Sequence, residues 1–223
     1  MKTDKYPRTY HMPWSPGATS DDKRLPEGWF DKLYKGKEVV ITEKLDGSNT
    51  CFTCTEVYGR SHATPTRNPW DKNLWGSEGL LWKVKSVIGV YEFVFGENLY
   101  GIHSIEYNRL PEYFFVFNVY NNYDDKWYSW DDVVMMANCM EVPTVPVLYR
   151  GVIESEDELK KLIDKLMSEP STFGDTKEGV VMRLADEFAG DDFADCVCKY
   201  VRANHVQTDE HWTRNWKKAS LCV

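Results

Sequence analysis

The chain has 223 residues, a mass of 26.0 kDa and a formal net charge of −8, and 42% of its residues are hydrophobic. This length and composition suffice for a sizeable core and exclude a disordered chain, while the acidic balance excludes nucleic-acid binding by bulk positive charge. No run is long and apolar enough to span a bilayer, and the polar start carries no export signal, so we expect one cytoplasmic domain over residues 1–223 with no membrane partner.

Residues 1–37 are rich in Pro, Gly, Trp and Tyr and show little periodicity. We expect an irregular N-terminal arm that Trp14, Trp29 and Phe30 pack over the core. Its basic residues are expected on a solvated surface.

Lys44 stands at the end of an apolar run. The run 39–41 predicts a buried strand, Asp46-Gly47 predicts a tight turn, and residues 49–57 predict the returning strand of a hairpin with Lys44 at its mouth. A lysine is a nucleophile only when neutral, and neutralising it at pH 7 costs roughly 4.6 kcal/mol. We therefore expect neighbouring cations, a metal or desolvation to assist, whereas a solvated lysine beside an ordinary turn is the alternative for this stretch alone.

The next segment joins a glycine turn to a helix start. Arg60 follows Tyr58-Gly59 and precedes Ser61-His62 in a short polar strand, so it is not expected in the core. Asn68-Pro69 predicts a helix start, because a capping side chain precedes a proline at the first helical position. The helix is expected to continue to residue 88, with its middle weakened by two glycines.

Two apolar strands follow. The first ends on Glu97, a carboxylate at a strand end that is suited to accept hydrogen bonds from a diol. The second, residues 113–120, contains Phe117 and Asn118, and its pattern alone predicts that Phe117 is a core residue.

Two predicted helices follow, and the start of each is marked by an N-cap residue. Ser129 and Ser155 are predicted N-caps, each with an acid three residues later. The second helix carries an apolar stripe at helical spacing, and we assign both helices to the scaffold. Residues 142–149 between them contain two prolines and predict at best an edge strand.

The last two strands carry Glu178 and Lys199. Glu178 opens an apolar strand over residues 179–183, where it is a candidate metal ligand or a plain strand-opening residue. Lys199 stands in an apolar run in which an unpaired ammonium is costly, which favours a functional role. Residues 204–223 form a short C-terminal tail of basic and aromatic residues, including His205 and His211.

The stretch KLDGSN at residues 44–49 resembles motif I of the covalent nucleotidyltransferases, which comprise ATP-dependent RNA ligases, DNA ligases and mRNA capping enzymes. The segments at Arg60, Glu97, Phe117, Glu178 and Lys199 resemble the later motifs in the same order. The segment EGVVMR at residues 178–183 is the most specific match after motif I.

The resemblance implies a role for each residue. Lys44 carries the nucleotide as a phosphoramidate, Glu97 binds the ribose hydroxyls, Phe117 stacks on the purine, and Glu178 helps bind Mg²⁺ or Mn²⁺. Lys199 and Arg60 stabilise the phosphates during catalysis. The other implied contacts are with the nucleotide at Glu43, Asp46 and Asn49, and with the polynucleotide substrate at Arg60, Arg67 and Arg202.

Two departures from the family pattern limit the resemblance. Motif V usually has two lysines, whereas here Lys199 is followed by Arg202, so the residue that replaces the missing lysine is open. Asn118 stands where the family more often has aspartate. The resemblance covers about residues 40–205.

Only 24 residues follow Lys199, too few for the OB-fold domain of DNA ligases and capping enzymes. Asn49 also stands where those enzymes more usually have arginine. The chain thus looks like a nick-sealing RNA ligase reduced to its catalytic domain, which implies an α+β fold of two antiparallel sheets with flanking helices and a nucleotide groove between them.

The implied function is ATP-dependent joining of 3′-hydroxyl and 5′-phosphate ends of RNA, or of RNA/DNA ends or nicks, in RNA repair through a lysyl-AMP intermediate. An auxiliary protein that supplies the missing domain is left open as a partner. The alternatives are a capping-type guanylyltransferase and a catalytically degenerate RNA-end-binding protein.

Overall fold

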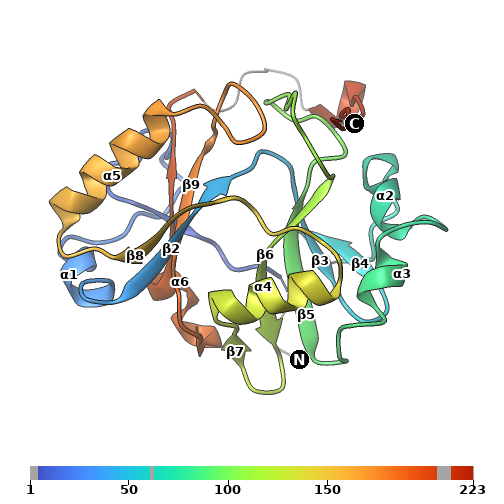
Figure 1. Cartoon of the computed structure of the whole chain (residues 1–223), viewed down its shortest axis with the longest axis horizontal. Helices are drawn as coiled ribbons and strands as arrows, with labels where there is room; N and C mark the ends of the chain where they lie inside the picture. The colour runs from blue at the N-terminus through green and yellow to red at the C-terminus, as the bar shows by residue number, and fades with distance from the viewer. Residues whose placement is uncertain (1–4, 61–62, 205–211, 223) are drawn as a thin grey trace.

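The computed structural model describes residues 5–60, 63–204 and 212–222. Two β-sheets lie side by side with helices on their outer faces (Figure 1). The elements run in the order β1 (Tyr10–His11), α1 (Trp29–Leu33), β2 (Glu38–Lys44), β3 (Ser48–Phe52), β4 (Val57–Gly59), η1 (Pro69–Asp71), α2 (Lys72–Trp75), α3 (Leu81–Val84), β5 (Glu92–Asn98), β6 (Phe114–Asn121), β7 (Lys126–Trp127), α4 (Trp130–Cys139), β8 (Val147–Val152), α5 (Glu156–Ser168), β9 (Gly179–Leu184), β10 (Phe188–Ala189), η2 (Gly190–Asp192), α6 (Phe193–Cys196), β11 (Val197–Val201) and η3 (Trp212–Asn215).

The first sheet has the strand order β1-β11-β9-β2-β8, and the second has the order β10-β7-β6-β5-β3-β4. This is the expected α+β arrangement of two sheets. The pairs described are antiparallel except for β1 with β11, a two-residue parallel pair made by the N-terminal arm. Strand β8 is an edge strand. It begins at Val147, after both prolines of the edge strand predicted over residues 142–149.

The first sheet has two different faces because successive side chains of a strand point to opposite sides. Val39 and Ile41 of β2 face outward and pack in a core cluster with Ile163 of α5 and Phe30 of α1. Val40, Thr42 and Lys44 therefore face the second sheet. Trp29 and Phe30 are buried and Trp14 packs against the same cluster, as the sequence predicted for the N-terminal arm.

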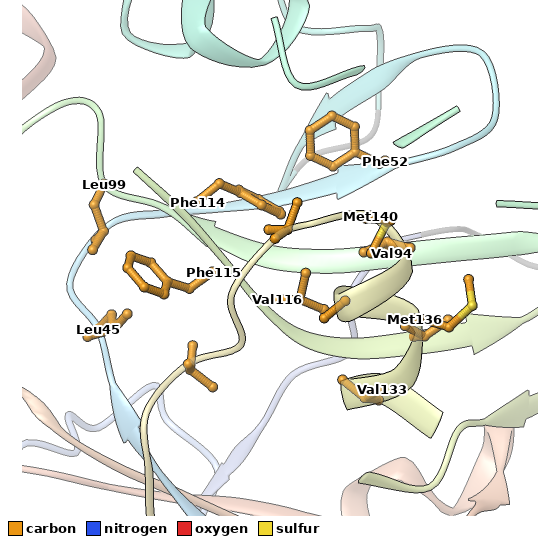
Figure 2. Close-up of a cluster of buried hydrophobic side chains, with 14 of the residues drawn as sticks. Leu45, Phe52, Val94, Leu99, Phe114, Phe115, Val116, Val133, Met136 and Met140 are labelled. Carbon is orange, nitrogen blue, oxygen red and sulfur yellow. The ribbon is translucent and has the colours of Figure 1, made fainter. Parts of the chain in front are cut away.

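The second sheet packs its outer face against α4 and the short helices α2 and α3. Figure 2 shows Val133 and Met136 of α4, and Met140 at the C-cap of that helix, beside Val94 of β5 and Val116 of β6. All but Met136 are fully buried, so this cluster makes a rigid support for the strands whose other face looks toward the first sheet.

The helix caps formed as predicted. Ser129 Oγ accepts a hydrogen bond from the backbone N–H of Asp132, and Ser155 Oγ accepts one from that of Glu158, each at 3.2 Å. The helix expected over residues 68–88 is instead broken into η1, α2 and α3. Gly76 takes an extended ψ of 172° at the end of α2, which stops the helical hydrogen bonding there.

The predicted hairpin at Lys44 was wrong. Strand β2 pairs with β8 and β9 in the first sheet, whereas β3 pairs with β4 and β5 in the second. Residues 45–47 therefore carry the chain from one sheet to the other. Gly47 is needed for a close approach, because a Cβ there would lie 2.5 Å from the carbonyl oxygen of Asn98.

Among the described residues, none of the helices is long and apolar enough to cross a membrane.

Candidate functional site

A cavity of about 300 Å³ lies between the inner faces of the two sheets. The N-terminal arm borders it through residues 6–9 and Asp22. The charged or polar residues of the two sheets that line it are Thr42, Glu43, Lys44, Asn49, Arg60, Glu97, Asn118, Arg183 and Lys199, and its apolar residues include Phe117, Trp130, Val145, Val181 and Val197.

Strand register explains why Lys44 and Lys199 meet in this cavity. Thr42, Val181 and Lys199 form one row across β2, β9 and β11. Lys44 is two residues beyond Thr42 and so points to the same face. Two lysines that are 155 positions apart in the sequence thus line one wall.

Lys44 is paired with Glu178. Its Nζ lies 2.7 Å from Glu178 Oε2, and the side chains are 25% and 7% exposed. Burial alone would lower the pKa of Lys44, but the carboxylates of Glu178 and Glu97 outweigh it and raise the pKa above its ordinary value. The protein therefore holds Lys44 as an ammonium, and its neighbours do not supply the neutralising environment that we expected.

Glu97 faces the same cavity from β5, opposite Asn49 of β3. Its Oε1 accepts a hydrogen bond of 3.2 Å from the backbone N–H of Gly47. Burial raises the pKa of Glu97 to about 8, and Glu178 adds to the effect while Lys44 opposes it. Glu97 thus keeps its proton to a higher pH than a solvated glutamate does.

Lys199 has the opposite electrostatic setting from Lys44. Burial lowers its pKa, and the positive charges of Lys44 and Arg60 lower it further. In the described part of the chain no hydrogen bond or ion pair reaches its Nζ. The negative charge of Asp22, in the N-terminal arm, raises the pKa of Lys199 but does not offset these effects. Such a cation is suited to receive an anionic group entering the cavity.

A β-bulge shapes the apolar end of the cavity. Phe95 of β5 pairs with Asn118 of β6, whereas the next residue, Gly96, pairs with Val116, so Phe117 has no partner in the ladder. A bulge re-aims side chains, and here both Phe117 and Asn118 line the cavity. Val181 lies on the wall of the first sheet, which leaves an apolar slot between the two sheets.

The carboxylates of Glu43 and Asp46 hold loops in place. Glu43 accepts hydrogen bonds from Ser171 Oγ and from the backbone N–H of Thr172, the latter at 2.9 Å. It is on the face of β2 opposite to Lys44. Asp46 Oδ2 accepts two bonds of 2.8 Å from the backbone N–H groups of residues 104 and 105. Their predicted contact with a nucleotide stays a prediction.

Arg60, Arg67 and Arg202, the arginines predicted to contact the polynucleotide, do not lie together in the structure. Arg60 is exposed and lines the cavity. Arg67 Nη2 instead pairs with Glu56 at 2.8 Å, and its guanidinium lies 5.7 Å from the ring centre of Trp75. The residues Ser61 and His62 beside Arg60, and His205 and His211 of the tail, lie outside the described residues.

Arg202 lies apart from Lys199. Strand β11 ends at Val201, as required for the two side chains to meet, but Arg202 lines a separate hollow with Met167 and Pro170. Its Nε and Nη2 are buried without a hydrogen-bond partner among the described residues. The structure therefore gives no replacement for the second lysine of motif V at this position.

Tyr6, Asp22 and Arg183 are among the residues at the cavity that were not predicted from the sequence. Tyr6 and Asp22 belong to the N-terminal arm, which has no periodicity to mark them. Arg183 is buried, and its Nη1 donates a 2.7 Å hydrogen bond to Asn118 Oδ1. Arg183 is the last residue of EGVVMR, so its place in that motif could have indicated a role at the site, but we assigned it none.

The acidic groups at the cavity fit a metal ion that takes most of its ligands from phosphate oxygens and water and few from the protein. Among the described residues no three His, Cys, Asp or Glu side chains are grouped to hold a metal ion. Glu178 is nonetheless a buried carboxylate beside the cavity, with Glu97 near enough to influence the same lysine. Mg²⁺ and Mn²⁺ accept such a site when phosphate oxygens and water supply the other ligands.

Comparison with known proteins gives one family. The sequence profile of the RNA ligase family matches residues 37–201. No curated protein matches the chain. The fold is similar to an archaeal ATP-dependent RNA ligase, with a TM-score of 0.56 and 14% identity over 89% of this chain and 48% of that one.

Two structures of a Naegleria gruberi RNA ligase are also similar. The one with pyrophosphate has a TM-score of 0.55 and 17% identity over 87% of this chain and 60% of that one. A variant with ATP and Mn has a TM-score of 0.51 and 15% identity over 85% and 58%. These similarities show that the two-sheet fold is that of the ligases, and the chain spans about half to three fifths of their length.

Proposed function

Because the chain belongs to the RNA ligase family, we propose that it is an ATP-dependent ligase that joins 3′-hydroxyl and 5′-phosphate ends through an AMP adduct on Lys44. The observation that carries this proposal is that Lys44 and Lys199 line one cavity between the sheets and that the buried carboxylate of Glu178 pairs with Lys44. A nucleophile, a cation that pairs with none of the described side chains, and a buried carboxylate are what transfer of a nucleotide to a lysine requires.

The proposed reaction has three steps. Lys44 Nζ attacks the α-phosphorus of ATP, a nitrogen–phosphorus bond forms, and pyrophosphate leaves with the electrons of the broken phosphorus–oxygen bond. AMP then moves to a 5′-phosphate, and a 3′-hydroxyl displaces the AMP to seal the strand. Each step is an in-line transfer at phosphorus, in which catalysis is mostly positioning and charge neutralisation.

Lys44 must lose a proton before it attacks. The proton is held by the charge of Glu178 at 2.7 Å, with a further contribution from Glu97. Glu178 is the residue that would hold a divalent cation, and a Glu178 carboxylate engaged in that way would no longer raise the pKa of Lys44 as it does here. The charges of Lys199 and Lys44 repel each other, which lowers the pKa of Lys199 and favours loss of a proton from the pair.

The other side chains at the cavity fit the parts of a nucleotide. Lys199 and, at the exposed end, Arg60 are suited to the phosphates. Glu97 and Asn49 lie opposite each other on β5 and β3 and offer hydrogen-bonding groups for ribose hydroxyls. Phe117 and Val181 form two sides of the apolar slot, which accepts a flat base.

ATP and Mg²⁺ or Mn²⁺ are the proposed cofactors. The structure of the Naegleria gruberi variant is described with ATP and Mn, and the metal would be held here by Glu178 together with phosphate oxygens. When bound it would neutralise phosphate charge and help pyrophosphate to leave.

The substrates are proposed to be ends or nicks in RNA or in RNA/DNA hybrids, in cytoplasmic RNA repair. An auxiliary protein that makes further contacts to the polynucleotide is a further proposed partner.

A degenerate RNA-end-binding protein is the second candidate. Two observations favour it, the raised pKa of Lys44 and the separation of Arg202 from Lys199. Such a protein would bind 5′-phosphorylated RNA without forming an adduct.

The experiment that separates these candidates is labelling with ATP in the presence of Mg²⁺. A label in the α-phosphate should remain on the denatured protein, whereas a label in the γ-phosphate should be released with pyrophosphate. Equal labelling from GTP would favour a capping-type guanylyltransferase. RNA binding without any α-label would favour the degenerate binder.

A further inference from the structure

Tyr6 of the N-terminal arm reaches into the apolar end of the cavity. Its ring centre lies 5.1 Å from that of Phe117, with the ring planes at 72°. Phe95, Trp127 and Phe193 surround the same ring at 5.1, 5.6 and 5.0 Å. Tyr6 therefore supports the edge of the ring on which the proposed base stacks.

The hydroxyl of Tyr6 is part of a hydrogen-bond chain. Arg183 Nη1 donates to Asn118 Oδ1 at 2.7 Å, and Asn118 Nδ2 donates to Tyr6 Oη at 3.4 Å. Arg183 thus fixes the orientation of the Asn118 amide, and Tyr6 accepts from its other end. Burial raises the pKa of Tyr6 to about 12, so the hydroxyl keeps its proton at neutral pH.

The path of the arm ties this position to the phosphate end of the cavity. Tyr10 pairs with Cys198 and His11 with Lys199 in the parallel β1–β11 ladder. The backbone N–H of Met12 also donates to the carbonyl oxygen of Lys199 at 2.8 Å. The strand that carries the catalytic cation therefore also anchors the arm that carries Tyr6, four residues before the first paired residue.

We propose that Tyr6 is a base-positioning residue of the nucleotide site, because its ring holds Phe117 and its hydroxyl holds Asn118 at the slot where the base enters. This inference rests on the proposed function in that it takes a nucleotide as the ligand. It predicts an effect of Tyr6 on nucleotide affinity and a much smaller effect on the chemical step, since Tyr6 lies with Phe117 and not with Lys44.

The test measures ATP binding by calorimetry and, separately, the rate of adduct formation at saturating ATP. Tyr6→Ala should weaken ATP binding by about 10-fold or more, the scale of one lost aromatic support at a base, and should leave the saturating rate within about 3-fold of the parent. Tyr6→Phe keeps the ring and loses only one neutral hydrogen bond. Its affinity for ATP should therefore lie within about 3-fold to 5-fold of that of the parent.

Tyr10→Ala is the matched control, since Tyr10 is in the same arm but does not line the cavity. Its ATP affinity should match that of the parent. Equal weakening in Tyr10→Ala and Tyr6→Ala would overturn the inference, because displacement of the whole arm would then explain the effect. Unchanged affinity in Tyr6→Ala, or a lower saturating rate at unchanged affinity, would overturn it as well.

Thermal unfolding of each variant checks the fold. If Tyr6→Ala unfolds, Tyr6→Leu replaces it, because leucine keeps apolar bulk but removes the aromatic edge; binding equal to that of Tyr6→Phe would then contradict the inference. Calorimetry needs no chemistry, so a parent that binds ATP without forming an adduct would refute the proposed ligase activity and leave the result for Tyr6 intact.

Discussion

Replacing Glu97 by glutamine should flatten the dependence of stability on pH. Burial and the neighbouring Glu178 raise the pKa of Glu97 from 4.5 to about 8. The folded protein therefore binds a proton between these pH values that the unfolded chain releases, and the free energy of unfolding falls as pH rises through this window. The stabilisation is complete below about pH 4.5 and is lost above about pH 8.

The magnitude follows from the two pKa values. Their difference corresponds to roughly 5 kcal/mol, which is an upper bound because the partly exposed carboxylate keeps some hydration and couples to Lys44. Between about pH 5 and pH 9, we expect the free energy of unfolding of the parent to fall by about 2 to 4 kcal/mol more than that of Glu97→Gln. Glutamine is a suitable replacement, since its oxygen can still accept the hydrogen bond from the backbone of Gly47.

The assay is urea unfolding of both proteins at several pH values in one buffer system. Glu92→Gln controls for the loss of a carboxylate, because Glu92 is on the same strand but does not line the cavity. Stability curves for Glu97→Gln and the parent that stay parallel to within about 0.5 kcal/mol would refute the electrostatic account of the cavity.

Three further predictions concern the rate of adduct formation, measured in single-turnover reactions with labelled ATP. Glu178→Ala should stay folded and lose most activity at limiting Mg²⁺, and near-normal labelling there would contradict its metal role. Lys199→Ala should be about 30- to 1000-fold slower, which corresponds to the loss of roughly 2 to 4 kcal/mol of transition-state stabilisation; a normal rate would remove Lys199 from the site. Arg202→Ala should form the adduct within about 3-fold of the parent rate, since Arg202 lines a different hollow, and a loss comparable to that of Lys199→Ala would contradict this separation.

Much of the fold followed from local patterns. The serine caps of α4 and α5 were predicted because capping groups act within a few residues, and an edge strand was expected around the two prolines that precede β8. Two sheets were expected from the family resemblance, not from the periodicity.

The partners of each strand could not be predicted in the same way. Asp46-Gly47 has the composition of a tight turn, but the chain there crosses between sheets, and Gly47 serves a close approach to Asn98. A dipeptide reports backbone freedom and not which strand pairs with which. The helix expected over residues 68–88 was wrong for a related reason, since Gly76 ends the helical geometry that the apolar spacing favoured.

The cavity was predicted only in part. The motif residues Lys44, Glu97, Phe117 and Lys199 line one space, because strand register places them on inward faces. Tyr6 reaches the same space through a parallel pairing of only two residues, which leaves no pattern in the sequence. The bulge that exposes both Phe117 and Asn118 depends on the register of β5 with β6, which is a property of two strands together.

The most direct test of the central claim is to find the residue that carries AMP. The protein is incubated with ATP and Mg²⁺, digested and sequenced by mass spectrometry, with Lys44→Ala and Lys44→Arg as the matched variants. The account predicts AMP on Lys44 in the parent and none on either variant, both of which should fold because Lys44 lies at the end of β2 with part of its side chain exposed. An adduct on another residue, or one that persists in Lys44→Ala, would contradict it.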